Sequence, residues 1–170
     1  MSDIARPWRA IEFRVRGTPA PKGSTRGRAG GVIPGSSAGN RDGLVSWTSA
    51  VRDAAAKAVD QLVGVGIEVI PFVKQPLRFT AVWYMRRPKS HFYQNGPRIG
   101  QVRDDAPYFH IVKPDASKLI RATEDDLINL VFDDDCTLAE HRTRKIYAAP
   151  GKEGAWVKIE LMEQQCPTPP

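Results

Sequence analysis

The chain is poor in the residues that build disulfide frameworks, zinc sites and membrane spans. Its 170 residues include only two cysteines and three histidines. The cysteines lie in dissimilar contexts and the histidines are scattered, which argues against a disulfide framework and a zinc-finger pattern. No apolar run approaches the roughly 18 residues that a transmembrane helix needs. Charged residues occupy the N-terminus, where a signal peptide would have an apolar core. We therefore expect a cytoplasmic protein without a membrane partner.

Two common catalytic motifs are also missing. The glycine-rich stretch at residues 27–35 has no Gly-Lys-Ser/Thr ending and does not lead from a strand into a helix, so it does not match a nucleotide-binding P-loop. A Gly-x-Ser-x-Gly elbow for acyl transfer is absent from the sequence. The sequence thus predicts no nucleotide cofactor and no acyl-transfer chemistry of this kind.

The chain does carry an excess of positive charge on an ordinary globular composition. It has 25 lysine and arginine residues against 19 aspartate and glutamate residues, a formal net charge of +6, and 41% of its residues are hydrophobic. This length fits one domain with a sizeable core, so residues 1–170 are treated as one domain. The charge favours a polyanionic partner such as nucleic acid, although ribosomal proteins and merely soluble basic proteins share this balance.

Hydrophobic periodicity predicts the first elements of this domain. Residues 10–16 alternate between apolar and charged side chains, as a half-buried strand does. Apolar residues between 44 and 63 fall on one helical face, and Gly64 and Gly66 end that helix. Residues 76–85 are rather apolar on both faces, which predicts a central strand.

The C-terminal part of the chain predicts a second helix and two further strands. The helix lies between residue 116 and about residue 130, and residues 137–148 and 154–162 read as an antiparallel pair around a turn. We therefore expect an α+β fold, with a small mixed or antiparallel sheet of about four strands and two main helices on one face. Its core spans about residues 10–162, and residues 164–170 form a frayed tail.

Two long polar segments interrupt these elements. Residues 17–43 are rich in Gly, Pro and Ser, which predicts a flexible loop that contains no regular element before the helix. Its cations suit either a phosphate-contacting arm or a disordered insertion, and we favour the arm. A second loop, from Arg86 to about Tyr108, interleaves basic residues with Phe92 and Tyr93. It would either grip a nucleic-acid backbone and stack on an unpaired base, or be a solvated loop with its aromatic rings against the core.

The segment at residues 110–136 holds more chemistry than any other. Pro114 cannot lie inside a helix, Asp115 favours a helix start, and apolar residues then recur at helical spacing. A helix is therefore expected from about residue 116 to residues 129–131. Three consecutive aspartates, at positions 133 to 135, follow it in a loop or at the start of a strand.

An acid before this helix and acids after it suggest a metal site. About fourteen helical residues span roughly 21 Å, so Asp115 and Asp135 meet only if the next strand runs back alongside the helix. Two carboxylates that face one cavity repel each other unless a cation lies between them, which is the physical case for Mg²⁺. Lys118 and Arg121, one turn apart, would flank the site with charge suited to a phosphate. The alternative is that Asp115 is a helix cap and the three aspartates a solvated turn.

Two motifs in this segment can be compared with a family. They are Lys113-Pro-Asp-Ala-Ser-Lys-Leu-Ile-Arg-Ala and Val131-Phe-Asp-Asp-Asp-Cys-Thr-Leu. The pair resembles the RusA family of Holliday junction resolvases, whose signature is a Pro-Asp-x-Asp-Asn/Lys-Leu-x-Lys/Arg-Ala helix followed by Asp-Asp. Gly17-Thr-Pro-Ala-Pro-Lys-Gly-Ser and Arg87-Pro-Lys-Ser-His-Phe are similar to turns of its phage-type members. The resemblance covers about residues 10–162.

The resemblance implies a homodimeric, Mg²⁺-dependent endodeoxyribonuclease that cuts four-way DNA junctions symmetrically in recombination and repair, with Mn²⁺ as a substitute metal. Carried over by position, it implies Asp115, Asp134 and Asp135 as metal ligands and Arg121 as the catalytic basic residue. The proposed catalytic residues are Asp115, Asp135, Arg121 and Lys118. A phage-encoded member would act in the cytoplasm of its bacterial host.

Ser117 departs from the family pattern, which has a second carboxylate at this position. A hydroxyl ligates Mg²⁺ weakly or through water and supplies no charge. The departure would weaken metal binding, shift the ligand role to Asp133, Glu124 or Asp125, or mark a member with reduced activity. Asp125 equally suits an ion pair with the basic residues one turn earlier, which is the interpretation we prefer. His110 would either orient a ligand or water, or pack beneath a loop.

Basic residues in the long loops and in the strand at 137–148 would hold the DNA arms. They are Lys22, Arg26, Arg28, Arg86, Arg87, Lys89, Arg142, Arg144 and Lys145. A basic strand is also common as a solvated sheet edge. A junction has two equivalent strands to cut, so a homodimer is expected. The alternatives to a junction resolvase are a protein that binds branched DNA without cutting it, and a less selective nuclease of flaps or forks.

Overall fold

The computed structural model describes five stretches of the chain: residues 9–22, 26–28, 31–33, 38–64 and 71–163. At residues 26–28, 31–33 and 38–40 it describes the backbone only. In chain order the elements are β1 (Ala10–Arg16), β2 (Arg26–Arg28), β3 (Gly31–Ile33), α1 (Ala38–Gly64), β4 (Leu77–Met85), η1 (Lys89–His91), α2 (Ala116–Glu124), η2 (Asp135–Thr137), β5 (Leu138–Tyr147) and β6 (Gly154–Leu161).

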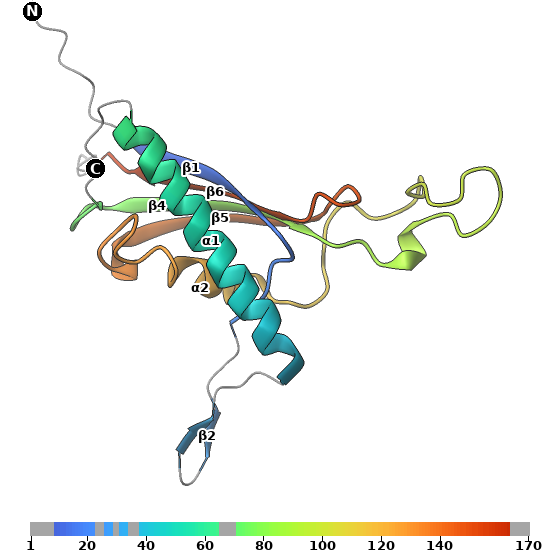
Figure 1. Ribbon diagram of the computed structural model, residues 1–170, viewed down its shortest axis with the longest axis horizontal. Coiled ribbons are helices and arrows are strands. Elements are labelled where there is room, and N and C mark those ends of the chain that lie inside the picture. The colour runs from blue at the N-terminus through green and yellow to red at the C-terminus, as the bar shows by residue number, and fades with distance from the viewer. Residues whose placement is uncertain (1–8, 23–25, 29–30, 34–37, 65–70, 164–170) are drawn as a thin grey trace, which may run out of the picture.

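Four of the strands form one mixed sheet, in the order β1-β6-β4-β5 (Figure 1). β6 is antiparallel to both β1 and β4, whereas β5 is parallel to β4. The expected α+β fold with a four-stranded mixed sheet is confirmed, and β4 is central, as the two apolar faces of its sequence indicated.

The expected pairing of β5 with β6 is wrong, because β4 lies between them. The chain leaves β5 and crosses the end of β4, where the Ala148 amide donates to the Met85 carbonyl at 2.8 Å. Charge also favours this order. Arg78 of β4 lies between two glutamates. Its Nε is 2.7 Å from Oε2 of Glu140 on β5, and its Nη1 is 3.6 Å from Oε1 of Glu160 on β6. A hairpin turn in the sequence thus connects two strands that share a central neighbour.

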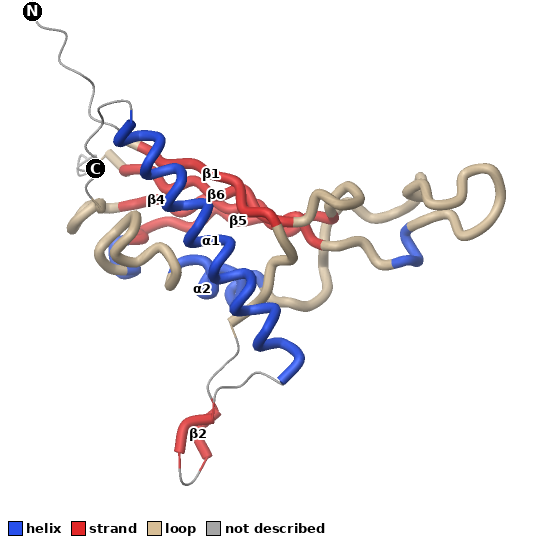
Figure 2. The backbone as a smooth tube through the Cα atoms, in the orientation of Figure 1, coloured by secondary structure: helices blue, strands red, loops and turns tan. Residues whose placement is uncertain are grey.

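The hydrophobic core lies between one face of the sheet and the two helices. Alternate residues of β4 are buried on this face, as in the pattern Leu77, Phe79, Ala81. α1 crosses the sheet diagonally (Figure 2) and buries Trp47 and Val51 against it. Full burial of a large apolar side chain contributes about 1.5–3 kcal/mol. α2 adds a narrower stripe to the same core, comprising Leu119 and Ala122.

Both helices differ in length from the sequence prediction. α1 ends at Gly64 as expected but begins at Ala38, earlier than residue 44. α2 ends at Glu124, several residues before the predicted end, and the chain continues as successive turns. Asn129 has a φ of 63°, a left-handed conformation that cannot continue a helix. In the described residues, no helix combines the length and apolar character needed to cross a bilayer.

The two polar loops are more ordered than their composition suggests. The expectation that residues 17–43 contain no regular element is wrong, because β2 and β3 pair as a small antiparallel sheet and α1 begins at Ala38. Backbone pairing of short strands tolerates glycine, which explains the difference. In the second loop, Arg98 pairs with Asp104 at 2.7 Å and stacks over Tyr93 at 4.4 Å from the ring centroid. Local charge pairs hold this loop, which projects from the end of the sheet in Figure 1.

Candidate functional site

α2 presents the family-like motif on its solvent face. Asp115 precedes the helix as its N-cap residue, and Ser117, Lys118 and Arg121 are exposed, while Leu119 faces the core. The Asp115 side chain makes no capping hydrogen bond, and its Oδ2 lies 3.6 Å from Lys118 Nζ. Such an exposed ion pair contributes less than about 1 kcal/mol. The Asp115 carboxylate therefore retains coordination capacity for a ligand.

The three aspartates after α2 have different surroundings. Asp134 and Asp135 are exposed, and Asp134 Oδ1 accepts a hydrogen bond from the Cys136 amide at 2.9 Å. Hydrogen bonds from that amide and then from the Cys136 thiol, followed by the interaction with the Asp135 side chain, lower the pKa of Asp134. The last contact places two carboxyl groups side by side. Asp133 is half-buried, and its Oδ1 is buried without a hydrogen-bond partner among the described residues.

Asp115 and the Asp134–Asp135 pair lie at opposite ends of α2. The charge of Asp135 acts on Glu124, the last residue of the helix, whereas Asp115 precedes the first. The nine helical residues rise about 13 Å. The next strand does run back alongside α2, as the metal-site hypothesis required, but the aspartates come before that strand begins. Among the described residues, no three or more His, Cys, Asp or Glu side chains are grouped so that they could hold a metal ion.

The Asp134–Asp135 pair nevertheless suits a magnesium ion that is held partly by the protein and partly by the substrate. Mg²⁺ commonly takes one or two carboxylates and completes its octahedron with waters and substrate phosphates. Two exposed carboxylates side by side repel each other when both are ionised, and a divalent cation removes that repulsion. The residues therefore fit a two-carboxylate site at the C-terminal end of α2. They do not fit a closed three-aspartate site that includes Asp115.

Arg121 is available near the same end of the helix. It lies one turn before Glu124, its side chain is exposed, and it makes no hydrogen bond or ion pair with another side chain in the described part of the chain. A guanidinium group presents paired donors that match phosphate oxygens. The C-terminal end of α2 thus combines a carboxylate pair with a free cation.

One acid–base pair at this end of α2 was not predicted from the sequence. Glu124 is buried, and its Oε1 forms an ion pair and hydrogen bond with Nε2 of His141 on β5. Burial raises the pKa of Glu124, His141 opposes that rise, and the charges of Asp135 and Asp125 add to it. Glu124, considered above as an alternative ligand, is therefore already engaged. Residues 124 and 141 are far apart in the sequence, and the packing of α2 against β5 brings them together.

The preferred ion pair of Asp125 with the basic face of α2 is not found. Asp125 pairs instead with Lys22, whose backbone amide also donates to the Lys118 carbonyl at 3.2 Å. Asp125 is still helical, as the C-cap residue of α2, but the backbone bond of Lys22 to α2 brings the Lys22 ammonium to its carboxylate. Lys22, expected to contact DNA, thus fastens the chain after β1 to α2.

The other eight predicted DNA-contacting residues fall into three groups. Arg87 and Lys145 donate to backbone carbonyls, and Arg142 pairs with Glu140 at 2.6 Å. Arg86, Lys89 and Arg144 are exposed and have no side-chain partner among the described residues. The side chains of Arg26 and Arg28 lie outside the described part of the structure. Among the predicted DNA-contacting residues whose side chains the structure describes, only Arg86, Lys89 and Arg144 can therefore contact a polyanion without losing an existing bond.

His110 packs beneath a loop, as one of the two alternatives supposed. It is 7% exposed, its ring centroid lies 4.8 Å from that of Tyr147, and its amide donates to the Lys145 carbonyl at 3.1 Å. Burial, and then the charge of Lys145, lower the pKa of His110. The Lys145 ammonium, which bonds to the Pro114 carbonyl, anchors the same region beside the start of α2.

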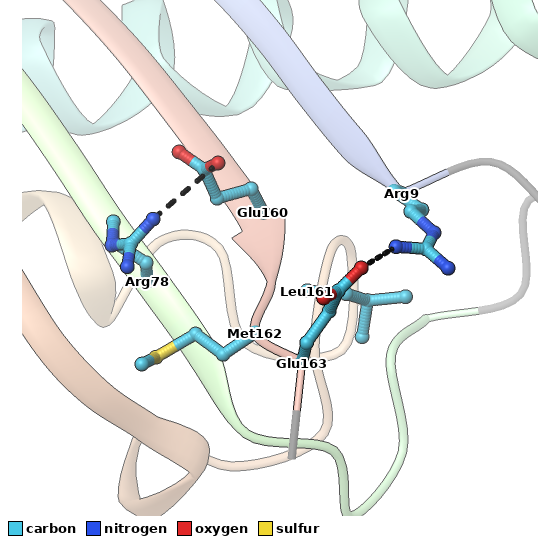
Figure 3. Close-up of a pocket in the computed structure, with 6 residues that line it drawn as sticks. All are labelled: Arg9, Arg78, Glu160, Leu161, Met162 and Glu163. Carbon is cyan, nitrogen blue, oxygen red and sulfur yellow. Dashed lines mark hydrogen bonds and ion pairs between the residues drawn. The ribbon is translucent and has the colours of Figure 1, made fainter. Parts of the chain in front are cut away.

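A further hollow, at the end of the sheet where β4 begins and β6 ends, has no unpaired cation among its described lining residues. Figure 3 shows Arg9 directed at Glu163 and Arg78 at Glu160, and both pairs are ion pairs. Each cation that lines this hollow of about 480 Å³ already has a carboxylate partner. The hollow therefore lies where β1 and β4 begin and β6 ends, and its described lining residues offer no unpaired cation to an anionic ligand.

Together these features define a small α+β protein with an exposed carboxylate pair that follows a helix exposing Lys118 and Arg121. No model of a known protein family matches the sequence. No curated protein matches it either. The resemblance to the RusA family therefore rests on the motifs at residues 113–138, and the activity that it implies is taken up as a proposal.

Replacing Lys145 separates its structural role from DNA contact. Lys145→Met keeps the aliphatic stem but removes the bonds to the Val112 and Pro114 carbonyls, at 2.9 and 2.6 Å. We expect the free energy of unfolding to fall by about 1–2 kcal/mol, measured by urea denaturation. The matched control, Arg144→Met, should change it by less than about 0.5 kcal/mol. Equal stability of the two variants would contradict the structural role of Lys145.

Proposed function

We propose that the protein is a Mg²⁺-dependent endodeoxyribonuclease that resolves four-way DNA junctions, with Mn²⁺ as a substitute metal. The observation that carries the proposal is the adjacent, exposed pair Asp134–Asp135 at the end of a helix that also exposes Arg121. The similarity of these residues to the RusA signature and the net charge of +6 support a DNA substrate.

The residues of the site would divide the work as follows. Asp134 and Asp135 hold the ion, with water and a phosphate oxygen of the DNA as its other ligands. When bound, Mg²⁺ lowers the pKa of a bound water and neutralises charge at the scissile phosphate. Arg121 donates charge-assisted hydrogen bonds to the phosphate oxygens. Lys118, one turn before Arg121, contacts a phosphate of the DNA strand beyond the scissile one, and Asp115, at the start of the helix, is its ion-pair partner.

A twofold assembly follows from the substrate. A four-way junction contains two equivalent strands to cut, and a homodimer places two equivalent sites on them. Arg86, Lys89 and Arg144, which have no described side-chain partner, would supply the salt-sensitive grip on the arms. The assembly is measurable as twice the mass of the chain in solution.

A second candidate function is the binding of branched DNA without cleavage. Two observations favour it. Ser117 stands where the family pattern has a carboxylate, and Asp115 does not join the Asp134–Asp135 pair. A protein with a weakened metal site keeps its basic surface and therefore its affinity for DNA. A less selective nuclease of flaps or forks shares the same site and differs only in substrate.

A cleavage assay separates these functions. Purified protein is incubated with labelled four-way junction, linear duplex and flap, in Mg²⁺ or in EDTA. We expect Mg²⁺-dependent product from the junction and little from the duplex. Junction binding without any Mg²⁺-dependent product would favour the non-cleaving function, and equal cutting of flap and junction would favour the less selective nuclease.

A further inference from the structure

A second, strongly basic hollow lies away from the acidic pair. It has a volume of about 430 Å³ and is bounded by the chain segment that follows β4 and by residues around His110. Arg86, Arg87 and Lys89 line it, together with Tyr147 of β5, and none of its described lining residues is acidic. A concave site of this size that gathers three cations suits an anionic ligand.

One arginine builds the rigid part of the hollow. Arg87 Nε donates to the Ala148 carbonyl at 3.1 Å and Nη1 to the Pro107 carbonyl at 3.0 Å. Its guanidinium carbon lies 5.3 Å from the centroid of the Tyr147 ring. These bonds hold Arg87 in place, so its charge is fixed beside the hollow without a carboxylate to neutralise it.

The other two cations have nothing in the described part of the chain to bind. Arg86 and Lys89 are both exposed, and neither side chain has a hydrogen bond or ion pair there. They stand three residues apart, on either side of the fixed Arg87. Two adjustable donors around a fixed charge can close on the oxygens of one anion.

A buried histidine supplies an independent sign of an unfilled site. His110 lines the hollow, is 7% exposed, and leaves its Nδ1 buried without a hydrogen-bond partner among the described residues. Buried polar groups normally find a partner, and those that lack one call for an explanation. The residues that line the hollow bring no negative charge to this imidazole, and an anion bound there would supply one.

We propose that the hollow between Arg86, Lys89 and His110 binds a phosphate group. Arg86 and Lys89 contact the phosphate oxygens, Arg87 contributes its fixed charge, and His110 lies against the bound group. The choice of DNA as the source rests on the proposed function, whereas phosphate binding itself does not require nuclease activity. On DNA, this contact would hold a phosphate away from the position that is cut.

Phosphate binding should make the site sensitive to pH. Burial and the charge of Lys145 lower the pKa of His110, so in the free protein this imidazole loses its proton at a lower pH than an ordinary histidine does. A bound anion favours the protonated ring, which raises that pKa, and binding must then tighten as the pH falls through it. The charged and titratable groups around the ring are Arg86, Arg87, Lys89, Lys145 and, across Tyr147, His91. None of them is an acid that would offset this effect.

The test uses the full chain in EDTA, so that cleavage plays no part. The imidazole resonances of His110 are followed by NMR during titration with inorganic phosphate and with a short single-stranded oligonucleotide, with or without a 5′-phosphate. We expect saturable shifts and a raised pKa of His110. Arg86→Gln/Lys89→Gln should weaken binding by about tenfold or more and reduce the slope of log affinity against log salt by about two. The charge-matched control Arg41→Gln/Lys57→Gln, exposed on α1, should change the affinity less than twofold.

The outcomes separate the source of the phosphate from the existence of the site. Equal binding of both oligonucleotides assigns the hollow to a backbone phosphate, and binding of the 5′-phosphorylated one alone assigns it to a terminal phosphate. Either result supports the proposal. Unmoved His110 resonances, or equal affinity of the Arg86→Gln/Lys89→Gln variant and the wild type, would overturn it. Binding of inorganic phosphate without either oligonucleotide would contradict DNA as the source. None of these results depends on whether the protein cuts junctions.

Discussion

Asp135→Asn is expected to lower Mg²⁺-dependent cleavage of a four-way junction by about 100-fold or more, while junction binding in EDTA is preserved. The substitution removes the charge of one of two adjacent carboxylates but keeps the size of the side chain. Loss of a metal ligand removes several kcal/mol of transition-state stabilisation, and each 1.36 kcal/mol is a factor of ten in rate. Single-turnover cleavage of a labelled junction measures the effect.

The control is Asp53→Asn, an exposed aspartate of α1, which should cleave at the wild-type rate. Asp115→Asn, measured beside it, reports whether the N-terminal end of α2 takes part in the same step. A loss as large as that of Asp135→Asn would place both ends of the helix at the scissile phosphate. Wild-type cleavage by Asp135→Asn would refute the assignment of the metal to the Asp134–Asp135 pair.

Phe132→Ala is expected to cause the largest loss of stability in the region of the site. Phe132 is fully buried and immediately precedes the three aspartates. Its carbonyl accepts from the Asn129 amide at 2.7 Å, and its neighbours Val131 and Asp133 bond to the backbone of Phe72. Replacing a buried phenylalanine with alanine typically costs about 3–5 kcal/mol. For a chain of this size we expect the melting temperature to fall by about 10 °C.

Thermal and urea denaturation measure this loss, with Val45→Ala as the matched control. Val45 is 68% exposed on α1, so its truncation should change stability by less than about 0.5 kcal/mol. Because Phe132 also fixes the entry to the carboxylate pair, cleavage by the folded fraction of Phe132→Ala should fall as well. A melting temperature equal to that of the wild type would show that Phe132 does not anchor this turn.

Local patterns in the sequence predicted where the helices and strands lie along the chain better than they predicted how the strands are ordered in the sheet. Alternation at residues 10–16 and 76–85 marked β1 and β4, and Gly64 marked the end of α1, because burial periodicity and backbone freedom are local properties. The position of β4 between β5 and β6 could not be read in this way. Strand order depends on contacts between distant residues, such as those of Arg78 with two glutamates, which leave no local signature.

The candidate site was predicted in composition but not in arrangement. The three aspartates and the exposed basic face of α2 are where the motifs placed them along the chain. The meeting of Asp115 with Asp135 depended on where α2 stops, and its end at Glu124 followed by turns kept the two apart. The partners of Lys22, Glu124 and His110 depended on tertiary packing and were therefore beyond the reach of spacing arguments.

Symmetrical cutting of a cruciform extruded from a supercoiled plasmid tests the central claim most directly. Two paired nicks across one junction convert the circle into linear DNA, whereas a single nick gives an open circle. The proposed function predicts linear product with Mg²⁺ and none in EDTA. A plasmid that stays supercoiled in Mg²⁺, while the protein still binds the junction, would contradict it.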